Sequence, residues 1–442
     1  MESPETKKRS RQRKQPETAG QLIIVGGGAA GMMAAVCAAR AGASVTILER
    51  NARLGKKLAQ TGSGRCNFTN TDFREECFRS ANASFPWQLL RRFSPEDSIR
   101  FFRELGIYPR YRGSYVYPHS DQASSLVNAL RQALSQLSVR VICDCLVERI
   151  QREGRGFRLR SSQGGFRGDA VLLAAGSRAF PVTGSDGSGY TLARQLGHSL
   201  IPVVPSLVGL RCAGRQYKEM AGVRTDALLT LRIDREEAYR ERGELQLTDY
   251  GISGIPVFQF SRLAAYGLLE QKKVSVTINF LPELSGEALL LYLRERKEML
   301  FYRTADSFLE GLLNQKLASV LLKRSGVPLS EAVSALREET LRRLAEEISA
   351  YSAEVIAANP FENAQCAAGG VDTSELDAKT LESRINPGLY FAGELLDVDG
   401  ICGGYNLQFA WASGAVAGRA AAAALRCRTG KVRQKKPDSQ ML

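Results

Sequence analysis

Hydrophobic and polar positions follow three different patterns along this chain. Near the start, an apolar run over 22–25 precedes an alanine-rich stretch over 29–41 and a second apolar run over 44–48. Short apolar runs of this kind are typical of buried parallel strands, and the stretch between them has the length of a helix. The chain therefore begins with a predicted strand–helix–strand unit.

Helical and strand-like patterns continue to about residue 200. They cover 86–105, 121–137, 139–145, 157–161 and 170–175. The first two have helical spacing and the other three have strand character; the last one is uniformly apolar and stops at Gly176, as a buried parallel strand does. This whole region is predicted to be an α/β domain.

The pattern changes in the middle of the chain and then returns. Short alternating runs separated by turn residues fill 201–281, which predicts an antiparallel barrel or sandwich. Leu, Glu, Arg and Ala at helical spacing over 283–350 predict a small helical subdomain. An apolar run at 388–392 and an alanine-rich helix over about 406–425 resemble the first region again.

We therefore predict an α/β protein whose two ends build one Rossmann-like domain around an inserted β-barrel-like domain and a small helical domain. The predicted boundaries are a basic disordered tail at 1–20, a first segment at 21–200, the β insert at 201–282, the helical subdomain at 283–350, a return to the β insert at 351–370, a second segment at 371–425 and a basic tail at 426–442.

The first helix begins with a glycine motif that is typical of dinucleotide sites. It reads Gly26-x-Gly28-Ala29-Ala30-Gly31, and Glu49 ends the next strand. The glycines allow a tight turn, close approach of a pyrophosphate and close packing of helix on strand, and the helix N-terminus faces the phosphate charge. A carboxylate at position 49 suits two ribose hydroxyls, which favours FAD or NAD; a merely structural turn is the alternative.

A glycine- and cation-rich loop follows over 55–70. It contains Lys56, Lys57 and Arg65 and has neither strand nor helix periodicity. Such a loop is either a flexible surface or a cradle for phosphate and ring groups, and its place after the ribose-binding strand favours the cradle. The lysines and the arginine are interpreted as contacts to a cofactor phosphate or a substrate anion, with solvated surface as the alternative.

A second glycine motif near the C-terminus favours a flavin. A strand ends at Gly393-Glu394, where a carboxylate at the carboxyl edge of a parallel sheet suits ribityl hydroxyls. Gly403-Gly404 then opens a helix, whose positive N-terminal end would stabilise the negative charge of a reduced flavin. The alternative is a helix cap with a packing glycine.

Charge and composition narrow the classes of function. The formal net charge is +14, and the tails at 1–19 and 426–442 carry most of it. Basic tails of this kind indicate solubility or weak polyanion contact, so we expect no dedicated nucleic-acid site. The mildly basic body is compatible with an anionic or CoA-linked small-molecule substrate.

Cysteine and histidine usage point to a cytoplasmic protein without a metal site. None of the nine cysteines lies in Cys-x-x-Cys, and the two histidines, His119 and His198, are far apart in the chain. The polar N-terminus does not look like a secretory signal, and no apolar run approaches the roughly 20 residues of a membrane span. We expect reducing cytoplasm and no membrane span.

Further motifs carry a resemblance to a known family. They are Gly64-Arg65-Cys66-Asn67, Tyr117-Pro118-x-Ser120-Asp121, Pro181-x-Thr183-Gly184-Ser185, Gly187-x-Gly189-Tyr190, Tyr250-Gly251-Ile252-Ser253-Gly254, Gly369-Gly370-Val371 and the block from Gly393 to Gln408. With the first glycine motif, they make the chain from Gln21 to about Ala424 similar to bacterial FAD-dependent oxidoreductases that include aminoacetone oxidase and 3-dehydro-bile acid Δ4,6-reductase.

The resemblance implies a two-segment FAD domain with the isoalloxazine near 64–67 and 403–406, and substrate entry between this domain and the insert. The residues then expected to bind FAD are Gly26, Gly28, Ala29, Ala30, Gly31, Glu49, Arg50, Lys57, Gly64, Arg65, Cys66, Asn67, Val147, Ala175, Gly176, Gly393, Glu394, Asp399, Gly404 and Asn406.

Three functions remain open at this point. The first is a reductase that uses NADH as a transient donor to saturate a C=C bond conjugated to a ketone, with 3-oxo-Δ4 and Δ4,6 bile acids as the specific candidates. The second is an aminoacetone-type oxidase that uses O2, and the third is a flavoprotein that binds RNA or protein through its tails. A reductase needs a proton donor, for which Tyr405, Tyr250 and Cys66 are the candidates, followed by His119; a buried thiol is the alternative for Cys66.

Overall fold

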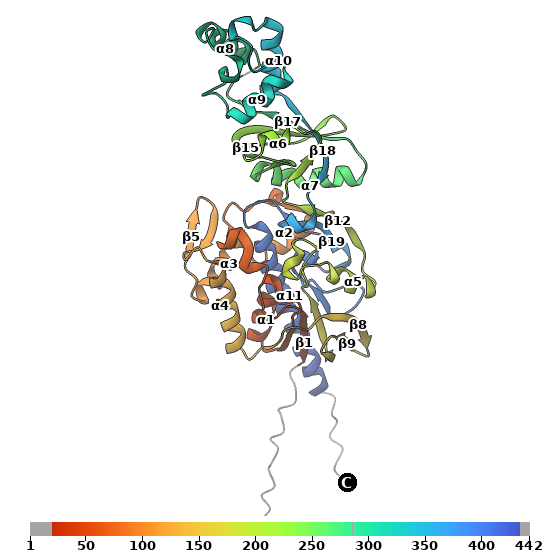
Figure 1. Ribbon diagram of the computed structural model, residues 1–442. Helices are drawn as coiled ribbons and strands as arrows, with labels where there is room; N and C mark the ends of the chain where they lie inside the picture. The colour runs from red at the N-terminus through yellow and green to blue at the C-terminus, as the bar shows by residue number, and fades with distance from the viewer. Residues whose placement is uncertain (1–19, 285, 434–442) are drawn as a thin grey trace, which may run out of the picture.

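The computed structural model describes residues 20–284 and 286–433 and has two bodies stacked along one axis (Figure 1). The lower body holds both ends of the described chain, and the upper body holds the middle. The predicted tail at 1–20 lies outside the described residues except for Gly20, and so do residues 434–442. Residues 426–433 are not a tail, because they continue the last helix.

A parallel sheet forms the centre of the lower body. Its strand order is β20-β11-β1-β2-β7, with residues from both ends of the chain in one sheet. The strands are β1 (Gln21–Val25), β2 (Ser44–Leu48), β7 (Arg140–Ile142), β11 (Ala170–Leu173) and β20 (Leu389–Phe391). Helix α1 (Ala29–Arg40) joins β1 to β2 and packs against α11 (Tyr405–Arg433). This is a Rossmann-type arrangement built from two segments.

Smaller elements surround this sheet. They are the helices α2 (Ser84–Leu90), α3 (Pro95–Glu104), α4 (Ala123–Gln136) and α5 (Ser188–Gln195), the sheet of β3 (Thr69–Asn70), β6 (Tyr115–Pro118) and β5 (Pro109–Arg112), the sheet of β8 (Val147–Glu153), β9 (Gly156–Ser161) and β10 (Gly164–Gly168), the pair of β12 (Leu200–Ser206) and β19 (Cys366–Val371), and the pair of β4 (Phe78–Arg79) and β21 (Asp399–Gly400).

The helical pattern predicted over 86–105 corresponds to two helices in the structure, α2 and α3. Ser94 interrupts the periodicity by capping α3, since its hydroxyl accepts a hydrogen bond from the Asp97 N–H and the Asp97 carboxylate accepts one from the Ser94 N–H. This capping box, followed by Pro95 at the first helical position, starts a new helix. The Ser-x-x-Asp pattern was the signal in the sequence.

The upper body contains a closed barrel with strand order β13-β16-β15-β14-β17-β18. Its strands are β13 (Leu210–Cys212), β14 (Arg224–Ile233), β15 (Glu236–Thr248), β16 (Gly251–Ser253), β17 (Val274–Asn279) and β18 (Tyr351–Ala358). Two helices, α6 (Tyr217–Met220) and α7 (Ile255–Leu269), interrupt the region that we predicted to be all-β. The run of α7 lacks the alternation of a strand and is apolar on most of its faces.

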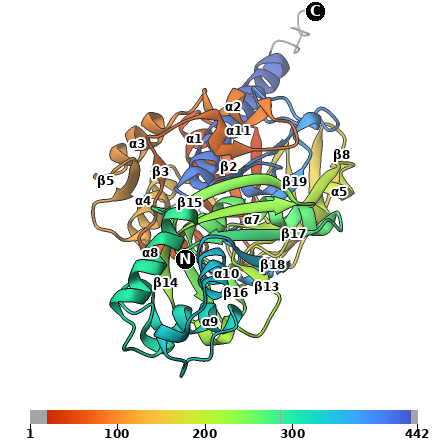
Figure 2. The ribbon, with the colours of Figure 1, turned by 90° about the horizontal axis from the view of Figure 1, so that it is seen from above.

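Three further helices extend the barrel core. These are α8 (Gly286–Met299), α9 (Gln315–Arg324) and α10 (Glu338–Ser349), which Figure 2 shows grouped beside β14 and β18. Their leucines share one hydrophobic cluster with the barrel strands. The lower body has its own separate cluster around the parallel sheet. No helix in the described ranges is both long enough and apolar enough to cross a membrane.

Candidate functional site

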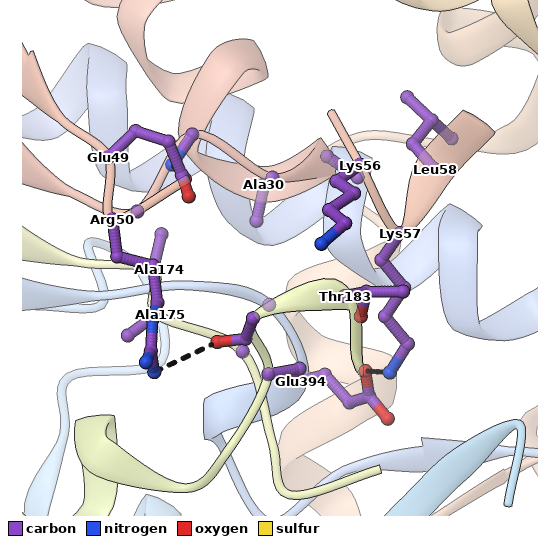
Figure 3. A pocket seen from close by; sticks show the side chains of 18 of the residues that line it. Ala30, Glu49, Arg50, Lys56, Lys57, Leu58, Ala174, Ala175, Thr183 and Glu394 are labelled. Carbon is purple, nitrogen blue, oxygen red and sulfur yellow. Dashed lines mark hydrogen bonds and ion pairs between the residues drawn. The ribbon is translucent and has the colours of Figure 1, made fainter. Parts of the chain in front are cut away.

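A cavity opens at the carboxyl ends of β1, β2 and β11, where open α/β sheets bind their ligands. Both segments of the lower body contribute to it, and Figure 3 shows its lining side chains. The predicted cofactor residues that line it are Gly26, Gly28, Ala29, Ala30, Glu49, Arg50, Lys57, Val147, Ala175, Gly176, Gly393, Glu394 and Asn406. The cavity therefore brings residues together that are up to 380 positions apart in the chain.

The glycines of the first motif have different roles in the turn. Gly26 has a positive φ of 104°, which a side chain would strain. A Cβ on Gly31 would lie 1.9 Å from the Gly26 carbonyl oxygen, so this glycine lets helix and turn pack in contact. A Cβ on Gly28 would meet no atom within 4 Å, and Gly28 lines the cavity. Gly28 thus leaves open space at the N-terminus of α1.

Glu49 is held rigidly at the end of β2. It is buried, and its Oε2 accepts a hydrogen bond from the Gly27 N–H at 2.7 Å. Its Oε1 accepts from the N–H and the side-chain amide of Asn51 at 2.8 and 2.7 Å. A carboxylate offers about four lone-pair sites, so capacity remains for a ribose hydroxyl. Beside it, the Arg50 guanidinium forms an ion pair with Asp186.

Lys57 and Glu394 form an ion pair across the cavity, with 2.6 Å between Nζ and Oε2 (Figure 3). The other Glu394 oxygen accepts a hydrogen bond from the Ala367 N–H at 3.0 Å, and Lys57 also donates to the Ala179 carbonyl at 3.1 Å. The pair fixes a carboxylate from the second segment over the loop of the first.

Replacing Lys57 with methionine is expected to raise the Kd for FAD on the order of tenfold, because the partly buried Glu394 loses its charged partner and its fixed orientation. Titrating the apoprotein with FAD and following flavin fluorescence measures this. Lys56→Met is the matched control, since Lys56 also lines the cavity but forms no ion pair among the described residues. Equal losses in the two variants would show that only net charge matters.

A second glycine cluster lies where the loop over 64–67 meets the N-terminus of α11. A Cβ on Gly404 would lie 2.8 Å from the Asn67 Oδ1, and that buried oxygen has no hydrogen-bond partner within the described chain. A Cβ on Gly64 would meet no atom within 4 Å. Asn406 lines the cavity and bonds Gly400 through both ends of its amide, at 2.9 Å each. An unsatisfied acceptor beside open space is suited to a polar ring ligand.

Among the predicted FAD contacts and Tyr405, eight residues do not line the cavity, and one of them, Asp399, is described below. Gly31 packs beneath it, and Gly64, Arg65, Cys66, Asn67, Gly404 and Tyr405 lie in the neighbouring cluster. Cys66 is fully buried at a positive φ of 59°, and burial raises the pKa of its thiol to about 12. Such a thiol stays protonated and is shielded from solvent. The structure does not support a catalytic role for Cys66.

The contacts of Tyr405 do not support its predicted role as proton donor either. Its hydroxyl donates a hydrogen bond to the Asp72 carbonyl at 2.8 Å, and its ring meets Phe78 edge-on, with 5.6 Å between centroids. Burial raises the pKa of the Tyr405 phenol above its ordinary value. Tyr405 therefore fastens the start of α11 to the loop that precedes β4.

Asp399 is also placed differently from the prediction. It is 1 % exposed and lies 2.9 Å from the Arg262 Nε, so it pairs with a side chain from α7 and does not face the cavity. Burial raises the pKa of Asp399 to about 6, although Arg262 and Arg79 favour its charged form. The structure therefore places Asp399 against α7 and outside the cavity lining.

The residues present fit FAD as the resident cofactor. Glu49 and Asn406 line the same cavity, together with the open space at Gly28 and the Lys57–Glu394 pair. The set contains an acid suited to the ribose, an N-terminal helix end suited to the pyrophosphate and a second acid suited to the ribityl chain. The orphaned Asn67 oxygen offers a further acceptor for the ring.

Comparison with known proteins assigns the fold and the cofactor class. The family model described as HI0933-like protein Rossmann domain matches residues 20–420. The chain belongs to the HI0933-like family. The chain is 43 % identical over 405 residues to a 3-dehydro-bile acid delta(4,6)-reductase of Clostridium scindens, covering 90 % of this chain and 98 % of that protein. The predicted resemblance to FAD-dependent oxidoreductases is confirmed.

Two more distant relatives also match most of the chain. Ribosomal RNA dihydrouridine synthases of Escherichia coli and Haemophilus influenzae are each 28 % identical and cover 88 % of this chain. They match over 95 % and 96 % of their own lengths. The matches therefore cover most of this chain and nearly all of both relatives.

Part of this HI0933-like site was missed from the sequence. The cavity is also lined by Asn51, Thr183, Gly184, Ser185, Gln365 and Cys366. The Pro181-x-Thr183-Gly184-Ser185 motif was visible, but nothing in its spacing showed that it folds back over β2. Asn51 bonds the Thr183 carbonyl at 3.1 Å, and that contact closes the adenosine end.

Proposed function

We propose that this protein is an FAD-dependent reductase that saturates a C=C bond conjugated to a ketone, with 3-oxo-Δ4 and Δ4,6 bile acid derivatives as the first candidates. The observation that carries the proposal is the 43 % identity to the Clostridium scindens reductase over 98 % of its length. The FAD-fitting cavity supports it. NADH is proposed as the transient electron donor.

The chemistry divides between cofactor and protein. When bound in reduced form at this site, FAD would supply the hydride chemistry for the β-carbon of the conjugated system. The protein must orient the substrate and deliver a proton to the α-carbon. We place the proton donor in a cluster formed by Tyr115, Tyr117 and Cys402. Two of the earlier candidates are less suitable, because the Tyr405 hydroxyl donates its hydrogen bond to a backbone carbonyl and Cys66 is fully buried.

The position of this cluster supports its role. A Cβ on Gly403 would lie 3.1 Å from a Tyr115 ring carbon, so the Tyr115 ring borders the turn that begins α11. Burial raises the pKa values of Tyr115, Tyr117 and Cys402, which keeps all three groups protonated at neutral pH. A protonated group beside the ring end of the FAD site is the form that a reductase needs.

We further propose that the barrel and the helices α8–α10 act as an inserted substrate-side domain. The β5–β6 hairpin of the lower body and β15 of the barrel approach each other near Tyr115, where burial raises the pKa of the Tyr115 phenol and the charge of Glu241 on β15 adds a smaller increase. Substrate entry between the two bodies would bring it past this cluster.

A second substrate class has a specific observation in its favour. The dihydrouridine synthases by name reduce a uracil C=C bond, which is also conjugated to a carbonyl, so the same hydride and proton steps apply. On the β5–β6 hairpin, Tyr111 and Tyr115 are 54 % and 38 % exposed, with Arg110 beside them. Exposed tyrosines and an arginine suit stacking with unpaired bases of RNA.

Anaerobic titration with NADH tests the proposal first. We expect the visible absorption band of the bound flavin to bleach and to return when an acceptor with a conjugated C=C bond is added. A 3-oxo-Δ4 bile acid and an unmodified uridine-containing ribosomal RNA fragment are the two acceptors to compare. Recovery with neither acceptor would sink the reductase proposal, and aminoacetone under air with peroxide detection would be the next assay.

A further inference from the structure

Helix α7 is the part of the upper body that reaches the cofactor domain. In Figure 1 it lies at the lower side of the barrel, next to the lower body. It packs against barrel strand β15 and against β12 of the lower body. The Tyr250–Gly254 motif, to which the site assigns no ligand role, forms the turn into α7. Gly251 and Gly254 have positive φ values of 147° and 104°, and this turn directs α7 toward the lower body.

Two polar side chains of α7 contact the segment over 399–406, which we call the flavin-facing turn. Arg262 forms the ion pair with buried Asp399 at its start. Gln259 accepts a hydrogen bond through Oε1 from the Cys402 N–H at 2.9 Å. The backbone carbonyl of Gln259 also accepts from Arg79 at 3.0 Å, and Arg79 pairs with Asp399 in the β4–β21 ladder.

The flavin-facing turn continues these contacts into the cavity. Gly400 follows Asp399 and exchanges two hydrogen bonds with the Asn406 amide, at 2.9 Å each. Asn406 lines the cavity directly. A chain of contacts therefore runs from α7, through Arg262, Asp399 and Gly400, to a residue that faces the cofactor.

We infer that Gln259 and Arg262 are positioning residues of the FAD site, through which the upper body sets the flavin-facing turn. A buried carboxylate has to be paired, and its partner here comes from the other body. The position of the barrel is thereby coupled to the affinity and the redox potential of the flavin. The inference rests on the proposed FAD site and not on the identity of the substrate.

The aromatic neighbour of Arg262 makes its position specific. The guanidinium carbon lies 5.0 Å from the centre of the Tyr266 ring, and the Tyr266 hydroxyl donates to the Pro202 carbonyl at 3.0 Å. The plane of the guanidinium is thus fixed from both sides. A lysine keeps the charge but cannot reproduce this planar stacking. Arg262→Lys should therefore keep part of the effect of Arg262 on the FAD affinity and the flavin potential, and Arg262→Met should keep none of it.

A matched control lies elsewhere in the upper body. Arg324 pairs with Glu347 at 2.7 Å and lies 4.7 Å from the centre of the Tyr351 ring, the same combination of ion pair and ring contact. It joins α9 to α10 and has no contact with the flavin-facing turn. Arg324→Met therefore reports what the loss of such a pair does to stability alone.

The test uses the full-length protein in four variants: Arg262→Met, Arg262→Lys, Gln259→Leu and Arg324→Met. For each we would measure the Kd for FAD with the apoprotein, the midpoint potential of the bound flavin and the Tm. We expect Arg262→Met to raise the Kd on the order of tenfold and to shift the potential, with a smaller change for Gln259→Leu. Arg324→Met should lower the Tm and leave both flavin properties unchanged.

The inference is overturned if Arg262→Met and Gln259→Leu keep the wild-type Kd and potential while their Tm falls as in Arg324→Met. Should Arg262→Met fail to fold, Gln259→Leu decides the question, because it leaves the buried ion pair intact. None of these measurements uses a substrate or NADH. If the proposed reductase activity fails, the Kd, potential and Tm measurements can therefore still be interpreted.

Discussion

Replacing Gly28 with valine is expected to give a folded protein that does not retain FAD. Gly28 has φ −79° and ψ −166°, an extended backbone that any residue adopts. A Cβ there would meet no protein atom within 4 Å, so the side chain costs the apoprotein little. The branched side chain would instead fill the open space at the N-terminus of α1, where the pyrophosphate of FAD is expected. The purified variant should be colourless with a Tm close to that of wild-type apoprotein.

Gly31→Val is the contrasting variant in the same motif. Its Cβ would be 1.9 Å from the Gly26 carbonyl oxygen, which forces helix α1 away from the turn. Overpacking against backbone should lower the free energy of unfolding by more than about 3 kcal/mol. Thermal unfolding of the apoproteins and the flavin content of the purified proteins separate the two effects. A Gly28→Val protein that is yellow would show that the pyrophosphate runs elsewhere.

The sequence was most informative where a local pattern determines local structure. The predicted strands at 22–25 and 44–48 and the first helix lie within one or two residues of β1, β2 and α1. Apolar runs and glycine spacing report such elements because neighbouring residues form them. The same reasoning placed Glu49, Lys57 and Glu394 at a cofactor site, and all three line one cavity.

The failures have a common physical cause, because they depend on partners that are distant in the chain. Asp399 follows a strand and a glycine turn, as a ligand-facing acid would, yet its partner Arg262 comes from a helix in the other body. Tyr405 stands beside a glycine pair, but its hydroxyl is taken by the Asp72 carbonyl. Neither partner has a signature in the sequence, because both contacts form only when parts of the chain that are far apart in sequence fold together.

Helix α11 illustrates how such long-range packing supports the site. Its alanine-rich sequence predicted a helix but not which face is buried. The structure places Gly414 and Gly418 against α1, where Cβ atoms would lie 2.4 Å from the Ala30 carbonyl oxygen and 2.3 Å from that of Ala34. Glycines spaced by four residues lie on one face of a helix, so the two backbones can approach closely.

Changing both glycines to alanine is therefore expected to destabilise the protein, although alanine favours a helix. Each substitution gains about 1 kcal/mol of helix propensity, which the clash with α1 outweighs to give a net loss of roughly 2 kcal/mol per site. Because α1 carries the phosphate-facing turn at its N-terminus, its displacement should also weaken FAD binding. Chemical denaturation and FAD titration of Gly414→Ala/Gly418→Ala measure the two losses.

Ala423→Gly is the control for helix propensity, since Ala423 lies on the exposed side of the same helix. It should lose about 1 kcal/mol of stability and keep its affinity for FAD. If the double alanine variant is instead more stable than wild type, the close approach of α1 and α11 is not required. The parallel sheet alone would then hold the phosphate-facing turn in place, and the second segment would contribute to the FAD site through the residues that line the cavity, among them Gly393, Glu394 and Asn406.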